Sequence, residues 1–212
     1  MSIQNSHMPS TQIELDTLIM ARPREFDAND ALEQAMQVFW DKGYQSASLN
    51  ALTQAMGISK SSFYEAFGSK HELYLSTLEH YNATVSGRVA ASLNGSESAR
   101  EAIANWFEFV IDRMAGRGSL RGCLMSNAAV ELAPFDPETQ GRCRQALGES
   151  EVALVACIER GQGAGEIRTD HEALDLARFL ITSINGLRVM AKANPDRKAL
   201  EGVAEIALSV LD

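Results

Sequence analysis

The sequence predicts an all-α fold of about nine helices. Apolar residues recur at spacings of three and four along most of residues 27–212, which is the pattern of helices that bury one face. Capping residues and glycines punctuate these stretches at regular intervals. No segment alternates apolar and polar residues for a useful length, so β-strands are not expected. With 45% hydrophobic and 22% charged residues, the 212-residue chain can bury an ordinary core.

The first 23 residues are polar and lack a sustained period, and we expect a disordered N-terminal extension. Met8 and Met20 are alternative starts, and Met20 opens a plausible native beginning, so residues 1–19 need not belong to the native protein. The stretch lacks a basic region followed by an apolar one, so no secretory signal is predicted.

Three short helices follow, each with a capping residue before it and a glycine that ends it: Asp27 and Gly43, Ser48 and Gly57, Ser59 and Gly68. The first carries an apolar stripe of Leu32, Ala35, Met36 and Phe39. Ser69 and Glu72 then form an S-x-x-E capping box for a fourth helix that reaches about Leu93. At 1.5 Å per residue this fourth helix is a rod of roughly 37 Å.

Five further helices are predicted beyond this rod. They begin near Glu97, residue 121, Pro137, Asp170 and Pro195. Proline at the first helical position and aspartate at the cap are typical helix starts. The glycines in "RGQGAGEIR" end the helix that begins at Pro137; no strand precedes them, so they do not indicate a dinucleotide loop.

Charge and cysteine content limit the classes of partner. The net charge is −9, and residues 1–70 hold 5 basic and 8 acidic residues, so no basic surface coats DNA non-specifically. Any DNA recognition must come from a few well-placed contacts. Three cysteines without C-x-x-C spacing argue against a disulfide framework and fit the cytoplasm. No stretch is long and apolar enough for a membrane helix.

The second and third helices, joined by "AMGIS", predict a helix-turn-helix over residues 47–66. In "GISKSSFYEAFGSK", Phe63 and Phe67 share one face, which packs. The other face and the helix start carry the candidates for DNA contact: Lys60, Ser61, Ser62 and Tyr64. Small hydroxyls at a helix N-terminus allow close approach to phosphate.

From Arg24 to Thr84 the chain resembles the TetR family of bacterial transcriptional regulators. The matching positions are Phe39, Gly43, Tyr44, Ser48, Leu52, Gly57, Ser59, Lys60, Tyr64, Phe67, Ser69 and Lys70. Gly68 departs from the proline often found there, and Asn50 replaces a commonly charged residue. The resemblance implies a homodimeric DNA-binding regulator, usually a repressor released from a near-palindromic operator by a small ligand, with no enzymatic activity and no cofactor. Residues 24–84 would bind DNA, and residues 85–212 would bind effector and dimerise.

The predicted DNA contacts are Arg22, Arg24, Ser48, Asn50, Ser59, Lys60, Ser61, Ser62, Tyr64 and Lys70. Arg22 and Arg24 form either a minor-groove arm or a solubilising charge pair. Lys70 contacts phosphate by resemblance; the alternative is an ordinary surface lysine.

The predicted effector site consists of Trp106, Val110, Met114, Cys123 and Asn127. Aromatics at helical spacing are more often plain core, and Asn127 could simply face water. Cys123 follows Arg121 at a helix start, where a thiol pKa can fall. It is therefore either a sensor of oxidants or electrophiles or a buried small hydrophobe. A regulator without any effector is a further alternative. An enzyme that uses Cys123 with His80 or His171 lacks a nucleophile motif.

The last two helices carry long apolar stripes that predict a four-helix dimer interface. Its residues are Ala177, Ile181, Ile184, Gly186, Leu200, Val203, Ala204, Ala207, Leu208 and Leu211. Gly87, inside the rod, is predicted to be a point of bending. No metal site is expected, because Asp170, His171 and Glu172 fit a capped helix start better.

Overall fold

The computed structural model describes residues 27–95, 98–115 and 121–212. The helices in these residues are α1 (Ala28–Ser46), α2 (Leu49–Met56), α3 (Lys60–Phe67), α4 (Lys70–Asn94), α5 (Ala99–Ala115), α6 (Leu124–Glu131), α7 (Pro137–Ala164), α8 (Ala173–Ala193) and α9 (Arg197–Leu208). A 3-10 turn, Ser209–Leu211, follows α9. The predicted all-α class is confirmed, and the described residues contain no strand. None of these helices is long and apolar enough to cross a membrane.

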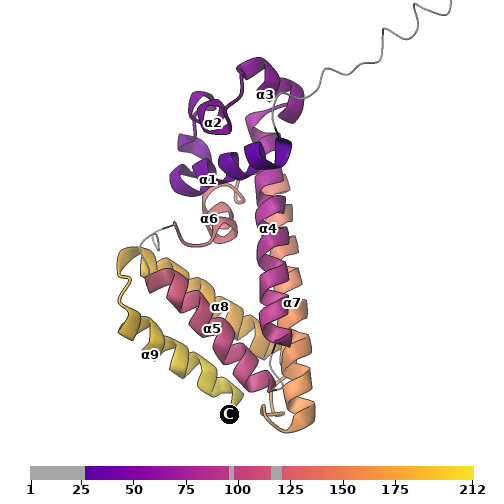
Figure 1. Ribbon diagram of the computed structural model, residues 1–212. Coiled ribbons are helices and arrows are strands. Elements are labelled where there is room, and N and C mark those ends of the chain that lie inside the picture. The colour runs from indigo at the N-terminus through magenta and orange to yellow at the C-terminus, as the bar shows by residue number, and fades with distance from the viewer. Residues whose placement is uncertain (1–26, 96–97, 116–120) are drawn as a thin grey trace, which may run out of the picture.

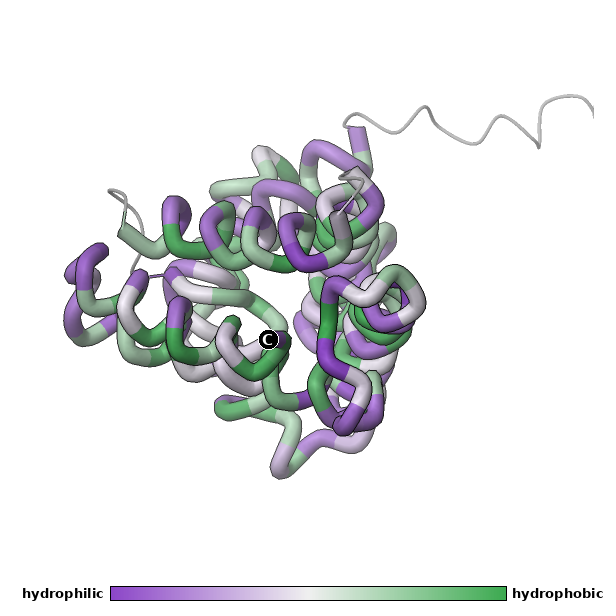
Figure 2. The backbone as a smooth tube through the Cα atoms, turned by 90° about the horizontal axis from the view of Figure 1, so that it is seen from below, coloured by the Kyte–Doolittle hydropathy of each residue, from purple (hydrophilic) through white to green (hydrophobic). Residues whose placement is uncertain are grey.

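The helices form a head, a long stalk and a C-terminal layer (Figure 1). Helices α1, α2 and α3 make the head, and α4 runs away from it beside α7. Helices α5, α8 and α9 pack together at the far end, while α6 lies between this layer and the head. Green and purple stretches alternate along the helices in Figure 2, as expected of helices that each bury one face.

The capping residues foreseen in the head begin its helices. The side chain of Ser48 accepts a hydrogen bond from the Ala51 N–H, and that of Ser59 from the Ser62 N–H, at 3.2 and 3.1 Å. Each bond satisfies one free donor at a helix start. Gly57 ends α2 in the left-handed conformation, with φ 67° and ψ 26°, which fixes the turn into α3.

Helix α1 is broken at Gly43 rather than ended by it. Gly43 has φ 75° and ψ 169°, and a further helical turn follows to Ser46. A Cβ atom on Gly43 would lie 2.8 Å from a carboxylate oxygen of Glu131. Both the positive φ and this close approach require glycine.

The described residues form two hydrophobic cores. One lies among α5, α8, α9 and the second half of α7, around Ile103, Phe107 and Leu180. The other joins the head to α6 and the first half of α7, through residues such as Phe39, Phe63 and Leu124. The boundary expected at residue 84 falls inside the unbroken helix α4. Helix α6 thus shares a core with the head.

The expected cap at Asp170 is wrong. Helix α8 begins at Ala173, and its capping position is Glu172, whose side chain makes no capping bond. Asp170 instead pairs with Arg168 at 2.5 Å. This local ion pair orients the turn before α8 and takes the carboxylate away from the helix start.

Most of the residues predicted at the dimer interface lie inside one protomer. Ala177, Ile181, Ile184, Leu200, Ala204, Ala207 and Leu211 are buried in its own core. Leu208 is half-buried against the same core. The first seven side chains therefore pack inside the protomer, whereas Leu208 keeps part of its surface exposed. The dimer interface itself stays a prediction. Gly186 and Val203 remain exposed.

Candidate nucleic-acid interface and ligand cavity

Helix α3 has one buried and one open face. Phe63 is fully buried in the head, at 5.3 Å between ring centroids from Tyr64 and 6.1 Å from Phe67. Tyr64 is 55% exposed, and Lys60 and Ser61 are exposed beside it. The division of this helix into a packing face and a free face is therefore as the sequence predicts. The free face presents a cation, a phenol and hydroxyls, all of which can bind phosphate or base edges.

The serines at the start of α3 form one hydrogen-bonded cluster. The Ser59 hydroxyl lies 2.8 Å from that of Ser61 and 2.9 Å from that of Ser62, besides capping the helix. Ser48 has the same capping role in α2, and Asn50 is exposed in the first turn of that helix. These residues fix the starts of both helices and leave small side chains at the surface.

Lys70 lies at the junction between α1 and α4. Its ammonium group is 4.6 Å from the centroid of the Tyr44 ring and 3.5 Å from the Gln45 carbonyl oxygen. Burial lowers its pKa, and the nearby Glu131 carboxylate opposes that effect. The lysine thus links the start of α4 to the end of α1 and stays partly exposed. Arg22 and Arg24 lie outside the described residues.

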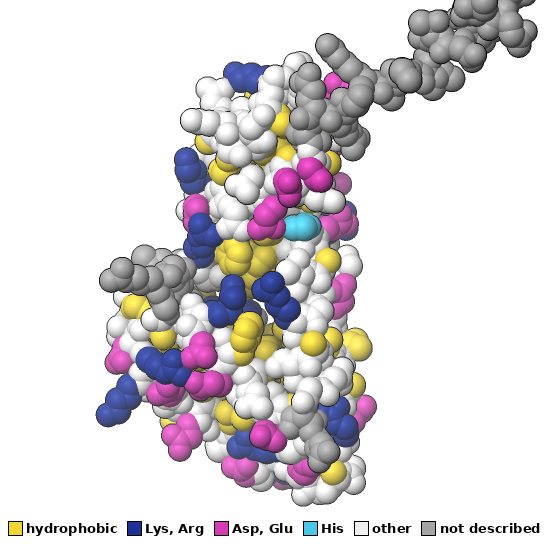
Figure 3. Space-filling model, viewed as in Figure 1, with side chains coloured by type: hydrophobic (Ala, Val, Ile, Leu, Met, Phe, Trp, Pro, Cys, Tyr) yellow, Lys and Arg dark blue, Asp and Glu magenta, His cyan; other side chains and the backbone are white. Residues whose placement is uncertain are grey.

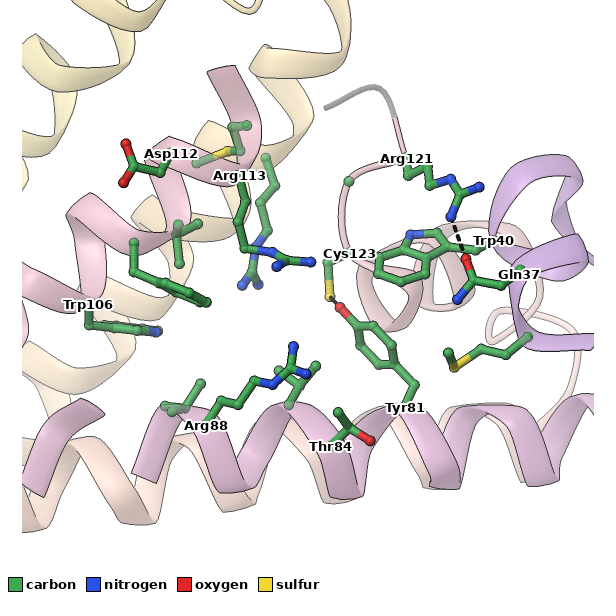
Figure 4. Close-up of a pocket in the computed structure, with 18 of the residues that line it drawn as sticks. Gln37, Trp40, Tyr81, Thr84, Arg88, Trp106, Asp112, Arg113, Arg121 and Cys123 are labelled. Atoms are coloured by element: carbon green, nitrogen blue, oxygen red, sulfur yellow. Dashed lines mark hydrogen bonds between the residues drawn. The ribbon is translucent and has the colours of Figure 1, made fainter. Parts of the chain in front are cut away.

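A cavity of about 850 Å³ opens between the head and the C-terminal layer. Its walls come from α1, α4, α5, α8 and the segment before α6. Figure 3 shows a hollow at this level with Lys or Arg and hydrophobic side chains around it. In Figure 4 the labelled side chains of Arg88, Arg113, Tyr81 and Cys123 converge on the cavity. A volume of this size accommodates a small organic ligand.

Four of the five predicted effector residues line this cavity: Trp106, Val110, Met114 and Cys123. Asn127 does not line it, and its predicted contact with an effector stays a prediction. Its side chain donates to the Arg121 carbonyl oxygen at 2.9 Å and accepts from Lys192 at 2.5 Å. These two bonds make it a brace for the segment that enters α6.

The thiol of Cys123 is buried in the cavity wall. The Tyr81 hydroxyl donates to its sulfur at 3.4 Å. Burial raises the pKa of this thiol, but Arg188 and hydrogen bonds from Tyr81 and Ser126 outweigh it, so that the pKa is lowered. In contrast, burial raises the pKa of the other two thiols, to about 11 for Cys143. Cys123 is therefore the most acidic thiol of the three.

The cationic part of the cavity is not among the features predicted from the sequence. Arg88, Arg113 and Arg188 line it, from α4, α5 and α8 respectively. These arginines follow no motif, and their convergence depends on how three helices pack. Apolar stripes and a cysteine at a helix start are visible in the sequence, whereas single arginines between them form no local pattern.

One cluster of possible metal ligands lies near the start of α7. Single ligand atoms of His71, Asp136 and Glu138 lie within 4.8 Å of one another. His71 Nε2 is 3.0 Å from Asp136, whose carboxylate also accepts the Thr139 N–H at 2.9 Å as the cap of α7. These interactions join the starts of α4 and α7.

A helix-turn-helix head with an exposed recognition face, joined by a long helix to a cavity-bearing helical domain, defines a DNA-binding transcriptional regulator. Residues 31–77 match the model for bacterial regulatory proteins of the tetR family, and residues 99–207 match the tetracyclin repressor-like C-terminal domain. The chain belongs to the TetR family, as its head predicts.

Known relatives resemble the chain over most of its length. It is 31% identical to the uncharacterized HTH-type transcriptional regulator YezE of Bacillus subtilis, over 91% of this chain and 100% of the relative. It is 28% identical to the HTH-type transcriptional repressor ComR of Escherichia coli, over 90% of each. A solved cysteine mutant of the TetR family regulator CifR, complexed with 26-base-pair operator DNA, is 37% identical with a TM-score of 0.81. That alignment covers 90% of this chain and 100% of CifR.

Proposed function

We propose that the protein is a homodimeric transcriptional repressor that binds a near-palindromic operator and is released by a small molecule. The observation that carries this proposal is the free face of α3, where Lys60 and Tyr64 stand clear of a head anchored by Phe63. ComR is a repressor, and CifR was solved on operator DNA. Both similarities support the same role here. We further infer that the protein acts in the cytoplasm and is not an enzyme.

The proposed dimer interface is formed by the outward faces of α8 and α9. These faces keep large apolar side chains exposed: Phe179, Val189, Met190, Val203 and Ile206. A Cβ on Gly186 would meet no atom within 4 Å, so this part of α8 is open to a neighbouring helix. Four such helices, two from each protomer, would bury these side chains in a two-fold interface.

Release requires that the ligand distinguish two conformations of the dimer. Helix α4 lines the cavity with Tyr81, Thr84, Val85, Arg88 and Val89, and it continues unbroken into the head. A ligand that shifts α4 would therefore move the head. Successive major grooves are about 34–36 Å apart, and a small tilt takes the two recognition helices away from that spacing.

A thiol switch at Cys123 is the second candidate function. The observation that favours it is the acidic, cavity-facing sulfur beside Tyr81. A thiolate reacts with oxidants and electrophiles, and modification there would add volume to the cavity wall. Under this alternative, a Cys123→Ser protein would bind operator and fail to respond to an alkylating agent. Under the leading proposal it would still respond to a reversible ligand.

The proposed function is tested by operator binding and release. Duplexes selected from a random pool would first identify the operator, and a compound screen would then seek release of that duplex. We expect a near-palindromic site bound by a dimer and at least one compound that weakens binding. If no compound weakened operator binding, the result would favour the alternative of a regulator without an effector.

A further inference from the structure

The cavity wall presents cations without anionic partners. Arg88 on α4, Arg113 on α5 and Arg188 on α8 all line it. Within the described parts of the chain, none of the three forms an ion pair with an aspartate or glutamate. Arg188 donates to the side-chain oxygen of Asn185 at 3.2 Å, and the Arg113 guanidinium lies 5.7 Å from the Phe109 ring centroid. Like charges that converge in this way favour an anion between them.

Among the described residues of the cavity wall, the two carboxylates, Glu33 and Asp112, both have cationic or histidine partners. Glu33 accepts from His80 on α4 at 3.0 Å. Asp112 pairs with Arg197 of α9 at 2.6 Å. Arg121, the fourth arginine of the wall, is held by Asp41 and Gln37. Arg121 is therefore neutralised by a carboxylate, whereas the other three guanidinium groups remain available to bind an anion.

Buried N–H groups in the same wall also lack acceptors. Trp106 is only 4% exposed, and its indole Nε1 has no hydrogen-bond partner in the described structure; the same is true of Trp40 Nε1. Both tryptophans line the cavity, and the indole nitrogen of Trp106 points toward its interior in Figure 4. A buried donor without an acceptor destabilises the fold, and a ligand oxygen that accepts its hydrogen bond would remove this penalty.

Apolar side chains cover the remaining surface near these donors. Val110 and Met114 on α5 and Val85 and Val89 on α4 line the cavity beside Trp106. A ligand that fills this space needs an apolar body as well as acceptor oxygens.

We propose that the effector is a small organic anion, with an oxyanion group held by Arg88, Arg113 and Arg188 and an apolar body packed against Trp106, Val110 and Met114. This proposal rests on the proposed function and names the effector's chemical class. Arg88 belongs to α4, whereas the other two arginines belong to the C-terminal layer. An oxyanion between them would draw α4 toward α5 and α8, which supplies the differential contact that release requires.

The test uses a matched pair of dyes that share one aromatic body. 1-Anilinonaphthalene-8-sulfonate carries a sulfonate, and N-phenyl-1-naphthylamine lacks it. The chain has 2 tryptophans, and both line the cavity, so energy transfer from tryptophan to dye reports dye bound in this region of the protein. We expect the sulfonate to bind at least about tenfold more tightly than the neutral dye, because charge-assisted bonds to arginine are strong. We also expect octanoate, but not octanamide, to displace it.

Substitutions locate the anion site. Arg113→Gln and Arg188→Gln should each weaken binding of the sulfonate about tenfold and leave the neutral dye unchanged. Arg144→Gln, on the exposed surface of α7, makes the same change in net charge and should have no effect. Melting temperatures and operator binding of every variant would verify the fold.

Equal binding of the two dyes by wild type would overturn the proposal. It would also be overturned if folded Arg113→Gln and Arg188→Gln proteins both retained wild-type affinity for the sulfonate. Failure of the proposed function looks different. A wild-type protein that selects no DNA sequence, yet binds the sulfonate through these arginines, would refute the repressor and support the anion site.

Discussion

The carboxylate of Glu131, at the end of α6, accepts a hydrogen bond from the backbone N–H of Tyr44 at 3.0 Å. Its second oxygen accepts from the N–H of Gln45, also at 3.0 Å. These donors belong to the last turn of α1, just after the break at Gly43 and just before α2. At the other end of α6, Gly122 and Cys123 line the cavity. One short helix therefore connects the cavity to the end of α1, directly before the helix-turn-helix.

Glu131→Ala should loosen this connection. It removes the acceptor of two backbone N–H groups, and we expect the free energy of unfolding to fall by about 1–3 kcal/mol. Urea denaturation measures this change. Glu159→Gln, at an exposed position of α7, is the control and should have little effect. A wild-type stability for Glu131→Ala would show that water replaces the carboxylate without cost.

Ile206→Glu should weaken the dimer without unfolding the protomer. Ile206 is 73% exposed on the outward face of α9, so a charge there meets water in the monomer and an apolar neighbour in the proposed dimer. Light scattering over a dilution series should show a monomer at concentrations where wild type is dimeric. Leu208→Glu is the contrasting variant, because Leu208 packs against the protomer core and its replacement should lower the melting temperature. A dimeric Ile206→Glu protein would place the interface elsewhere.

Asp136→Asn should destabilise the protein in a pH-dependent way. Hydrogen bonds from Thr139 and His71 lower the pKa of Asp136 to about 2. A carboxyl group whose pKa is lower in the folded state stabilises the fold above its unfolded pKa, about 3.9. That contribution is lost as the pH falls through about 2. The difference in unfolding free energy between wild type and variant should be about 1–2 kcal/mol at neutral pH and shrink below about pH 4. A difference independent of pH would contradict this account.

Gly87→Ala should stiffen the long helix. Gly87 lies inside α4, and an added Cβ would meet no atom within 4 Å, so alanine fits. The substitution should stabilise the helix by about 0.5–1 kcal/mol. Operator affinity should stay near wild type, and release by an effector should be blunted. Titration of both proteins with operator, in the presence and absence of the effector, makes the comparison. An unchanged response would remove Gly87 from the mechanism.

The sequence predicts the helices well because their limits are local. Ser48, Ser59 and Gly57 fix the helix-turn-helix through bonds within a few residues, and the outcome follows from their order in the chain. The dimer face could not be found in the same way. The sequence of an apolar stripe on α8 or α9 is the same whether its own protomer or a partner covers it. In this structure most residues of both stripes are buried in the protomer core. The arginines of the cavity and the bond from Glu131 to Tyr44 join residues far apart in the sequence, so only the packed structure brings them together.

Helix α3 is proposed to read the DNA sequence. Its free and buried faces predict opposite outcomes for neighbouring substitutions. Lys60→Ala and Tyr64→Ala should fold as wild type does, because both side chains are exposed. Phe63→Ala should lose about 3–5 kcal/mol of stability, because the ring is fully buried.

Selection of bound duplexes from a random pool, with wild type and the folded Lys60→Ala and Tyr64→Ala proteins, tests that claim most directly. For wild type we expect enrichment of two inverted half-sites one helical turn or a multiple of it apart. The two variants should enrich the same site weakly or not at all. No enrichment by wild type, or equal enrichment by both variants, would contradict the account.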